Sequence, residues 1–197
     1  MTDARDAILQ AAARCIARKG ERGLRVLDVA KEADVSAGLL YYHFSDRDGL
    51  LAATLEHINA QALGYRGRAE PPSDPTERLF ALLVDEVDDD PDLYDSSVAW
   101  NEIRASAVFD ATLRDHLART TEAWQADVAA AVRAAQDSGA VAADTDPDGL
   151  ALALTVLVEG ITARWLSGQL DTDRARRALR AAAVRIIGSD HDERALR

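Results

Sequence analysis

The feature that most constrains this chain is a pair of short amphipathic segments, separated by a three-residue break near the N-terminus. Apolar residues in the first segment recur at three- and four-residue spacing, which places them on one face of a helix: Val26, Val29, Ala30 and Ala33. In the second segment Leu40 and Phe44 are four residues apart, so they share a face that can pack back onto the first helix. The break at 34–36 has room only for a tight turn. The sequence therefore predicts two helices joined by a sharp turn.

The break itself suits a sharp turn followed by a new helix. Asp34 tolerates the left-handed backbone that such a turn demands, and Ser36 can cap the second helix through its hydroxyl group. The outer face of the second helix is small at its N-terminal end and aromatic further on, and it comprises Ala37, Gly38, Leu39, Tyr42 and His43. A slim helix end can enter a DNA major groove, which is about 12 Å wide. The pattern is typical of a DNA-binding helix-turn-helix, although a chance pair of helices in any helical protein would give similar spacing.

The same residues resemble the signature of the TetR family of transcriptional repressors. That signature reads roughly D-I-A-x-x-A-G-V-S-x-G-x-L-Y-x-H/Y-F-x-x-K-x-x-L, and this chain carries DVAKEADVSAGLLYYHF from position 28, followed by Arg47 and Leu50. The match covers about the first 50 of 197 residues. Three positions depart from it, since Asp34 stands at the usual turn glycine, Arg25 at the usual threonine before the first helix, and Arg47 at the usual lysine.

The resemblance implies an all-α fold of about nine helices, with a three-helix helix-turn-helix head and a larger helical body for ligand binding and dimerisation. We place the head at residues 1–45 and the body at residues 46–197, with a connecting helix over 46–65 that belongs to both. The implied function is that of a ligand-responsive regulator, most often a repressor, which binds a palindromic operator as a dimer. A small molecule would move the connecting helix, spread the two heads and release the DNA.

Residues on and beside the second helix are the expected DNA contacts. Residues 37–39 are expected at base edges, chiefly thymine methyl groups, and residues 41–43 with Arg47 mostly at phosphates. Residues 37–43 contain no Arg, Lys, Asn or Gln, so much of the selectivity should come from DNA shape or from Arg25. The full predicted set is Arg25, Val26, Ser36, Ala37, Gly38, Leu39, Tyr41, Tyr42, His43 and Arg47.

The charge of the chain is divided unevenly along its length. Residues 1–50 hold eight basic and eight acidic side chains, so the rest of the chain carries the whole net charge of −11. An acidic body would repel phosphate and orient the protein head first, although acidic surfaces also serve solubility alone. A helix predicted over 3–19 places Cys15 on its apolar side as a structural thiol. Basic side chains near it could flank the DNA backbone or form a solvated face: Arg14, Arg18, Lys19, Arg22 and Arg25.

Helix boundaries in the body are marked by capping residues. An Asp at the N-cap followed by a Pro occurs three times, at Asp74-Pro75, Asp90-Pro91 and Asp146-Pro147. Asp110 is a fourth predicted cap, and the predicted helix ends include Gly139, Gly168 and Gly188. Helices are therefore predicted at 75–89, 91–106, 111–137, 147–167 and 172–187. An irregular segment before them is marked by Gly64, Gly67 and Pro71-Pro72.

The last two predicted helices are apolar on more than one side, so they must be buried on several sides. The resemblance implies that they form a four-helix interface with a second subunit across a two-fold axis, which places two heads on a palindrome. The alternative is a core within one chain. The predicted interface residues are Leu154, Val158, Ile161, Trp165, Leu179, Ala183 and Ile186.

The middle of the body holds the rarer aromatic and polar residues that an enclosed small-molecule site requires. The C-terminal half also loosely resembles the choline-sensing repressor subgroup, and an aromatic and acidic lining would suit a cation. Ordinary core packing is the alternative for Trp100 and Trp124. The predicted pocket residues are Phe80, Tyr94, Trp100, Asn101, Glu102, Arg104 and Trp124.

No pattern of catalytic residues stands out, so we expect no enzyme, no cofactor and no metal site. The four histidines lack ligand spacing, and no phosphate loop or nucleophile elbow occurs. A single cysteine, the absence of a long apolar run and a polar N-terminus favour a cytoplasmic chain without a membrane segment. The expected partners are double-stranded DNA, a small-molecule effector and a second copy. Two alternatives stay open, a small-molecule-binding dimer with weak or lost DNA affinity and a helical metal-dependent hydrolase.

Overall fold

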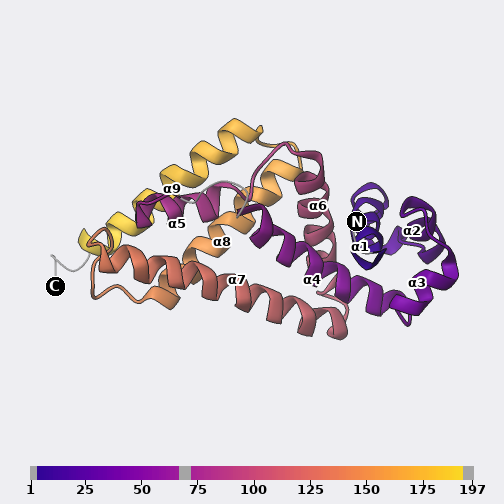
Figure 1. Cartoon of the computed structure of the whole chain (residues 1–197). Helices are drawn as coiled ribbons and strands as arrows, with labels where there is room; N and C mark the ends of the chain where they lie inside the picture. The colour runs from indigo at the N-terminus through magenta and orange to yellow at the C-terminus, as the bar shows by residue number, and fades with distance from the viewer. Residues whose placement is uncertain (1–3, 67–71, 193–197) are drawn as a thin grey trace. The chain divides into compact units, whose positions relative to one another are not determined.

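The computed structural model describes residues 4–66 and 72–192, and regular structure within these ranges is helical (Figure 1). The helices are α1 (Ala4–Lys19), α2 (Val26–Glu32), α3 (Ala37–His43), α4 (Arg47–Arg66), α5 (Pro75–Val84), α6 (Pro91–Ser106), α7 (Ala111–Asp137), α8 (Pro147–Leu166) and α9 (Thr172–Asp192). A 3₁₀ turn, η1 (Glu21–Gly23), joins α1 to α2. The predicted all-α fold class is confirmed.

The helices of the body start where the capping residues predict. The carboxylate of Asp74 accepts the backbone N–H groups of Thr76 at 2.7 Å and Glu77 at 3.3 Å, and Asp90, Asp110 and Asp146 cap their helices in the same way. These bonds satisfy N–H groups that have no partner inside the helix. Helices α6 and α7 accordingly have the predicted bounds.

Two of the predicted helix ends are wrong. Helix α5 ends at Val84 instead of residue 89, and the chain turns so that Val87 is buried against Trp165 and Ala175. Helix α9 continues past Gly188 to Asp192, since a single glycine inside a helix costs only about 1 kcal/mol. Gly64 likewise lies inside α4, whereas Gly67 and Pro71 lie outside the described residues.

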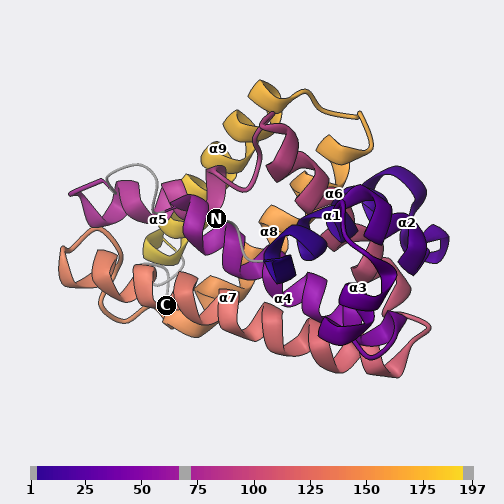
Figure 2. The ribbon, with the colours of Figure 1, turned by 45° about the vertical axis from the view of Figure 1, so that its right-hand side comes forward.

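The chain divides into two compact units. The first comprises residues 1–63 and 90–120, and the second comprises residues 64–89 and 121–197. The first unit thus contains α1 to α3, most of α4, all of α6 and the start of α7. Helix α6 packs along α1 (Figure 2). The predicted head and body boundary at residue 45 stays a prediction, because the compact unit extends beyond the helix-turn-helix.

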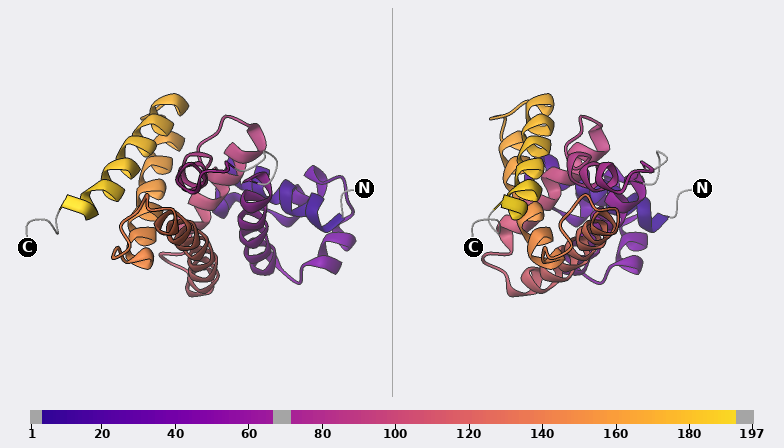
Figure 3. Two further views of the ribbon diagram at one scale, coloured as in Figure 1. Left: turned by 60° about the vertical axis from the view of Figure 1, so that its left-hand side comes forward. Right: turned by 90° about the vertical axis from the view of Figure 1, so that its left-hand side faces the viewer.

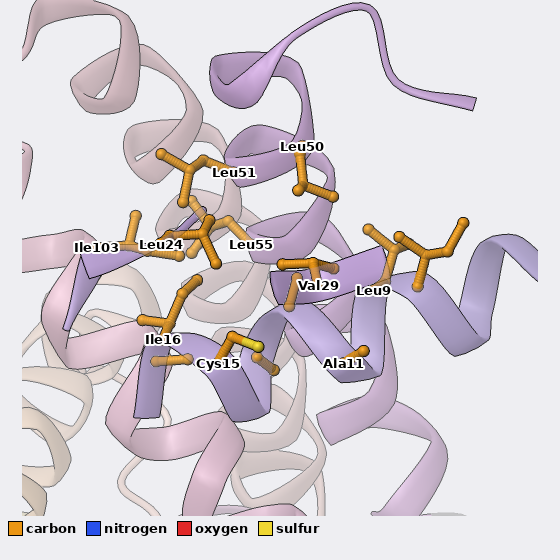
Figure 4. Close-up of a cluster of buried hydrophobic side chains, with 14 of the residues drawn as sticks. Leu9, Ala11, Cys15, Ile16, Leu24, Val29, Leu50, Leu51, Leu55 and Ile103 are labelled. Carbon is orange, nitrogen blue, oxygen red and sulfur yellow. The ribbon is translucent and has the colours of Figure 1, made fainter. Parts of the chain in front are cut away.

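The core of the first unit is built from α1, α2, α4 and α6 (Figure 4). Fully buried side chains from these helices meet there, among them Leu9, Ile16, Val29, Leu55 and Ile103. Cys15 belongs to the same cluster and is 2% exposed, so its predicted structural position is confirmed. Burial raises the pKa of this thiol, which keeps it protonated and unreactive.

In the second unit α8 packs against α9, and α5 contacts both (Figure 3). The shared core includes Leu79, Val128, Leu154 and Leu179. Helix α8 is long and apolar enough to cross a membrane, with a mean hydropathy of 1.5 over 18 residues. No such segment was predicted from the sequence, and α8 passes a test of length and composition alone. Core helices of water-soluble folds pass the same length and hydropathy test, and here one side of α8 is buried in the core.

Candidate nucleic-acid interface

The turn between α2 and α3 has the predicted left-handed residue. Asp34 has φ 54°, and the next N–H, that of Val35, donates to the Ala30 carbonyl at 2.9 Å to close the end of α2. Ser36 accepts the Leu39 N–H at 3.1 Å and so caps α3. Leu40 and Phe44 are buried as predicted, and they pack α3 onto the core of the first unit.

The remaining face of α3 is open to solvent. Gly38 is exposed, and Leu39, Tyr41 and Tyr42 are 37%, 52% and 83% exposed. Ala37 and His43 are half-buried, and the His43 ring lies edge-on to Tyr42. An exposed face of this kind, narrow first and aromatic later, has the shape required for groove entry. The individual DNA contacts of residues 36–43 stay predictions.

The N-terminal basic cluster is largely paired within the first unit. Arg14 and Arg18 both bind Glu32, at 3.0 and 2.6 Å, and Lys19 binds Asp28 at 2.7 Å. These pairs tie α1 to α2. Arg14, Arg18 and Lys19 therefore hold the two helices together through ion pairs. The prediction that they form a free basic face is wrong for these three residues.

Two exposed cations of α2 are differently placed. Arg25 and Lys31 form no ion pair within 4.0 Å in the described part of the chain. Both flank α2, Arg25 at its N-cap and Lys31 in its last turn. They are thus the cations of α2 that are most available to phosphate. Arg25 was in the predicted set of DNA contacts and Lys31 was not. Lys31 lies within the segment from position 28 that resembles the TetR signature, and that position could have suggested it.

The Glu32 pairs give a pH prediction. Hydrogen bonds from Arg14 and then Arg18 hold the pKa of Glu32 below its ordinary 4.5. A lowered folded pKa contributes stability above pH 4.5 and loses it as pH falls through the folded value. Urea unfolding from about pH 6 to about pH 3 should therefore show a steeper loss of stability for wild type than for Glu32→Gln. Equal slopes in this range would contradict the role of these pairs.

Arg47 was predicted to contact phosphate, and the structure gives it a role inside the protein. Its guanidinium group pairs with the Glu21 carboxylate and donates to the backbone carbonyls of Glu21, at 2.7 Å, and Leu24, at 3.4 Å. The Arg47 side chain is 36% exposed, and that of Glu21 is 7% exposed. Phosphate contact by Arg47 stays a prediction, since part of the side chain is accessible. Its partner could not be read from the sequence, because Glu21 is 26 positions away.

The predicted pocket residues fall into two groups. Tyr94, Trp100, Asn101, Glu102 and Arg104 lie on α6 in the first unit, whereas Phe80 and Trp124 lie in the core of the second. On α6, Arg104 donates to Asn101 at 3.1 Å, and its guanidinium carbon lies 5.9 Å from the centre of the Trp100 ring.

In the second unit, core packing accounts for the burial of Phe80 and Trp124. The indole N–H of Trp124 and the hydroxyl of Thr162 are nevertheless buried without a hydrogen-bond partner in the part that the structure describes. Buried polar groups normally have partners. The described residues also contain no group of three His, Cys, Asp or Glu side chains that could hold a metal ion.

Most of the predicted interface residues are buried within their own chain. Five of them are at most 5% exposed, namely Leu154, Val158, Trp165, Leu179 and Ala183. Ile161 and Ile186 are half-buried. Packing within one chain accounts for the burial of the first five, and contact of these seven residues with a second subunit stays a prediction. The exposed apolar side chains of the same helices are Leu152, Val156 and Val184, at 53%, 58% and 50%.

Two family models match the sequence. Residues 8–54 match the bacterial regulatory proteins of the TetR family, and residues 75–188 match the C-terminal part of BetI-type transcriptional repressors. The second match alone covers more than half of the chain. The chain belongs to the TetR family. The family is one of transcriptional regulators, so the resemblance stated from the sequence is confirmed for both halves.

Relatives of known structure share the TetR fold along nearly the whole chain. A TetR-family regulator from Rhodococcus sp. is 48% identical, with a TM-score of 0.89 over 95% of this chain and 100% of its own. A transcriptional regulator from Saccharomonospora viridis in complex with choline is 28% identical, with a TM-score of 0.76 over 92% of this chain and 95% of its own.

Among curated proteins, the transcriptional regulator BetI of Burkholderia ambifaria is 29% identical over 109 residues, which make up 54% of this chain and 56% of that protein. BetI of Burkholderia cenocepacia is 33% identical over 84 residues. The TetR-family chain thus spans about half the length of the curated relatives that it matches.

Proposed function

We propose that this TetR-family chain is a cytoplasmic repressor that binds a palindromic DNA operator as a homodimer and is released by a small organic cation. The observation that carries the proposal is the exposed face of α3, where Gly38 and Leu39 lie in the first turn after the Ser36 cap. A capped, slim helix end, together with the available cations Arg25 and Lys31 at the two ends of α2, supports entry into a major groove.

Selection of bound fragments from random DNA, followed by gel shift, tests the DNA half of this proposal. We expect a palindromic site with half-sites about one helical turn apart. The alternative of a small-molecule-binding dimer with weak DNA affinity is favoured by the uncharged α3 face and by the neutralised cations of α1. Failure to enrich any sequence at low salt would decide for that alternative.

For the dimer, the exposed apolar side chains of α8 and α9 support an interface. Leu152 and Val156 are four residues apart on α8, and Gly160 continues this row with open space around it. Small residues permit close approach of a partner helix. Sedimentation equilibrium should therefore give a dimer for wild type and a monomer for Val156→Asp. A dimeric Val156→Asp variant would place the interface elsewhere.

For the effector, we propose a quaternary ammonium compound, with choline as the first probe. The choline complex of the Saccharomonospora viridis regulator supports this class, as does the BetI-type match of residues 75–188. The unpartnered Trp124 indole N–H and Thr162 hydroxyl are polar groups that a ligand hydroxyl or carboxylate could satisfy. Choline should lower the affinity for the selected DNA, whereas an isosteric neutral alcohol should not.

Arg25→Ala gives a specific prediction for phosphate contact. Removal of one phosphate contact per head should weaken binding to all duplexes by a similar factor and reduce the salt slope by about 1 per head. Thermal stability should stay unchanged, because Arg25 forms no ion pair in the described residues. A changed base preference would instead place Arg25 at a base edge. Lys31→Ala provides the matched comparison on the other end of α2.

A further inference from the structure

Glu21 is the one charged residue that is buried among those the structure describes, with 6% of its surface exposed. Its partners come from two helices that are far apart in the sequence. The Ser106 hydroxyl at the end of α6 donates to its carboxylate at 2.9 Å, and Arg47 at the start of α4 pairs with the same carboxylate. A buried carboxylate without such partners would be strongly unfavourable. Loss of the bond from Ser106 should therefore weaken the pairing with Arg47, and the reverse should also hold.

Helix α6 holds the 3₁₀ turn by a second contact as well. The backbone N–H of Glu21 donates to the Glu102 carboxylate at 3.3 Å. That carboxylate also lies beside Gly20, where a Cβ atom would come within 3.0 Å of it. Glu102 and Ser106 are four residues apart and therefore share one face of α6. The last turns of α6 are thus bound to both the backbone and the side chain of Glu21.

The opposite end of this network reaches the helix-turn-helix. Arg47 donates to the Leu24 carbonyl at 3.4 Å, and Leu24 directly precedes Arg25, the N-cap of α2. The side chain of Arg25 makes no capping bond of its own. Hydrogen bonds therefore connect Ser106, through Glu21 and Arg47, to the residue before the helix-turn-helix. All of these residues belong to the first unit.

From this geometry we infer that Glu21 is a positioning residue, which couples the end of α6 to the helix-turn-helix. DNA binding by the helix-turn-helix then stabilises the last turn of α6. The inference rests on the proposed DNA-binding function. Coupling between two sites is reciprocal in free energy. A displacement of α6 would therefore change DNA affinity through the same bonds, since α6 cannot shift relative to η1 without breaking them.

The test is amide hydrogen exchange on the full chain, with and without the duplex obtained by selection. In wild type the duplex should slow exchange of amides 103–107 by about fivefold or more, the lower end of ordinary coupling. Ser106→Ala removes one link and should reduce this slowing to less than about twofold while the duplex Kd changes by less than about threefold. Ser106→Thr keeps a hydroxyl and should restore the wild-type response.

Ser97→Ala is the matched control, because it removes a hydroxyl from the same helix that forms no hydrogen bond in the described residues. It should behave as wild type. Full slowing in Ser106→Ala, or no slowing in a wild type that binds the duplex, would overturn the coupling. Failure of wild type to bind any selected duplex would instead overturn the proposed function, and the coupling with it. Melting temperatures of the variants separate a response to DNA from a general loss of stability.

Discussion

Arg47→Ala should reduce the free energy of unfolding by about 2–3 kcal/mol, because it leaves the Glu21 carboxylate buried and without its cation. The figure lies below that for a fully buried pair, since the Arg47 side chain is 36% exposed. Two backbone carbonyls also lose their donor, those of Glu21 and Leu24. Chemical denaturation of the full chain, with the first-unit signal followed separately by hydrogen exchange, measures the effect.

Two control variants make this result specific. Arg25→Ala removes the same charge from the same region and should leave stability unchanged. Combining Arg47→Ala with Glu21→Gln should recover part of the loss, because an amide is cheaper to bury than an unpaired carboxylate. A loss below about 0.5 kcal/mol for Arg47→Ala would place it among ordinary surface substitutions and contradict the internal role. If the folded Arg47→Ala variant also showed a smaller salt dependence of DNA binding, Arg47 would contact phosphate in addition to its internal role.

Gly38→Leu should strongly weaken DNA binding without harming the fold. A Cβ atom at Gly38 would meet only the Ser36 hydroxyl, at 3.8 Å, and the backbone there is ordinary helix. Stability should stay equal or rise by up to about 1 kcal/mol, since glycine is a poor helix former. A branched side chain at the narrow end of α3 would, however, obstruct its entry into the groove. We expect a loss of roughly 3 kcal/mol in binding, about a hundredfold in Kd.

Gly38→Ala extends this prediction to a graded series. Alanine adds one methyl group, so its binding loss should be smaller than that of leucine, while its stability gain should be similar. Gel shift or fluorescence anisotropy with the selected duplex measures both variants. If Gly38→Leu bound the duplex as wild type does, residue 38 would not face the DNA.

Local signals in the sequence determined much of the fold. The Asp-Pro caps at positions 74, 90 and 146 act through neighbouring backbone N–H groups, so they are visible without tertiary structure. The Asp34 turn and the Ser36 cap are local in the same sense. The end of α5 is different, because it depends on Val87 finding Trp165.

The candidate site was less accessible to sequence reasoning, for two physical reasons. Apolar periodicity marks a buried face but does not distinguish burial in one chain from burial against a second. Leu154 and Leu179 were predicted at an interface from this pattern, and both are fully buried within their own chain. Ion pairs depend on distance in space, so the pairing of Arg47 with Glu21 and of Arg18 with Glu32 has no sequence signature. From the sequence, Arg18 of α1 and Arg47 of α4 were therefore treated as available to DNA, whereas both form ion pairs within the protein.

The most direct test of the central claim is to replace single thymines of the selected half-site by deoxyuridine, which removes only the major-groove methyl group, and to measure the duplex Kd. With Ala37 and Leu39 against the base edges, each contacted methyl group should be worth about 1 kcal/mol, roughly fivefold in Kd. The same replacements outside the half-sites should have no effect. Equal affinity for every substituted duplex, or no preference for any duplex at low salt, would contradict the placement of α3 in the major groove.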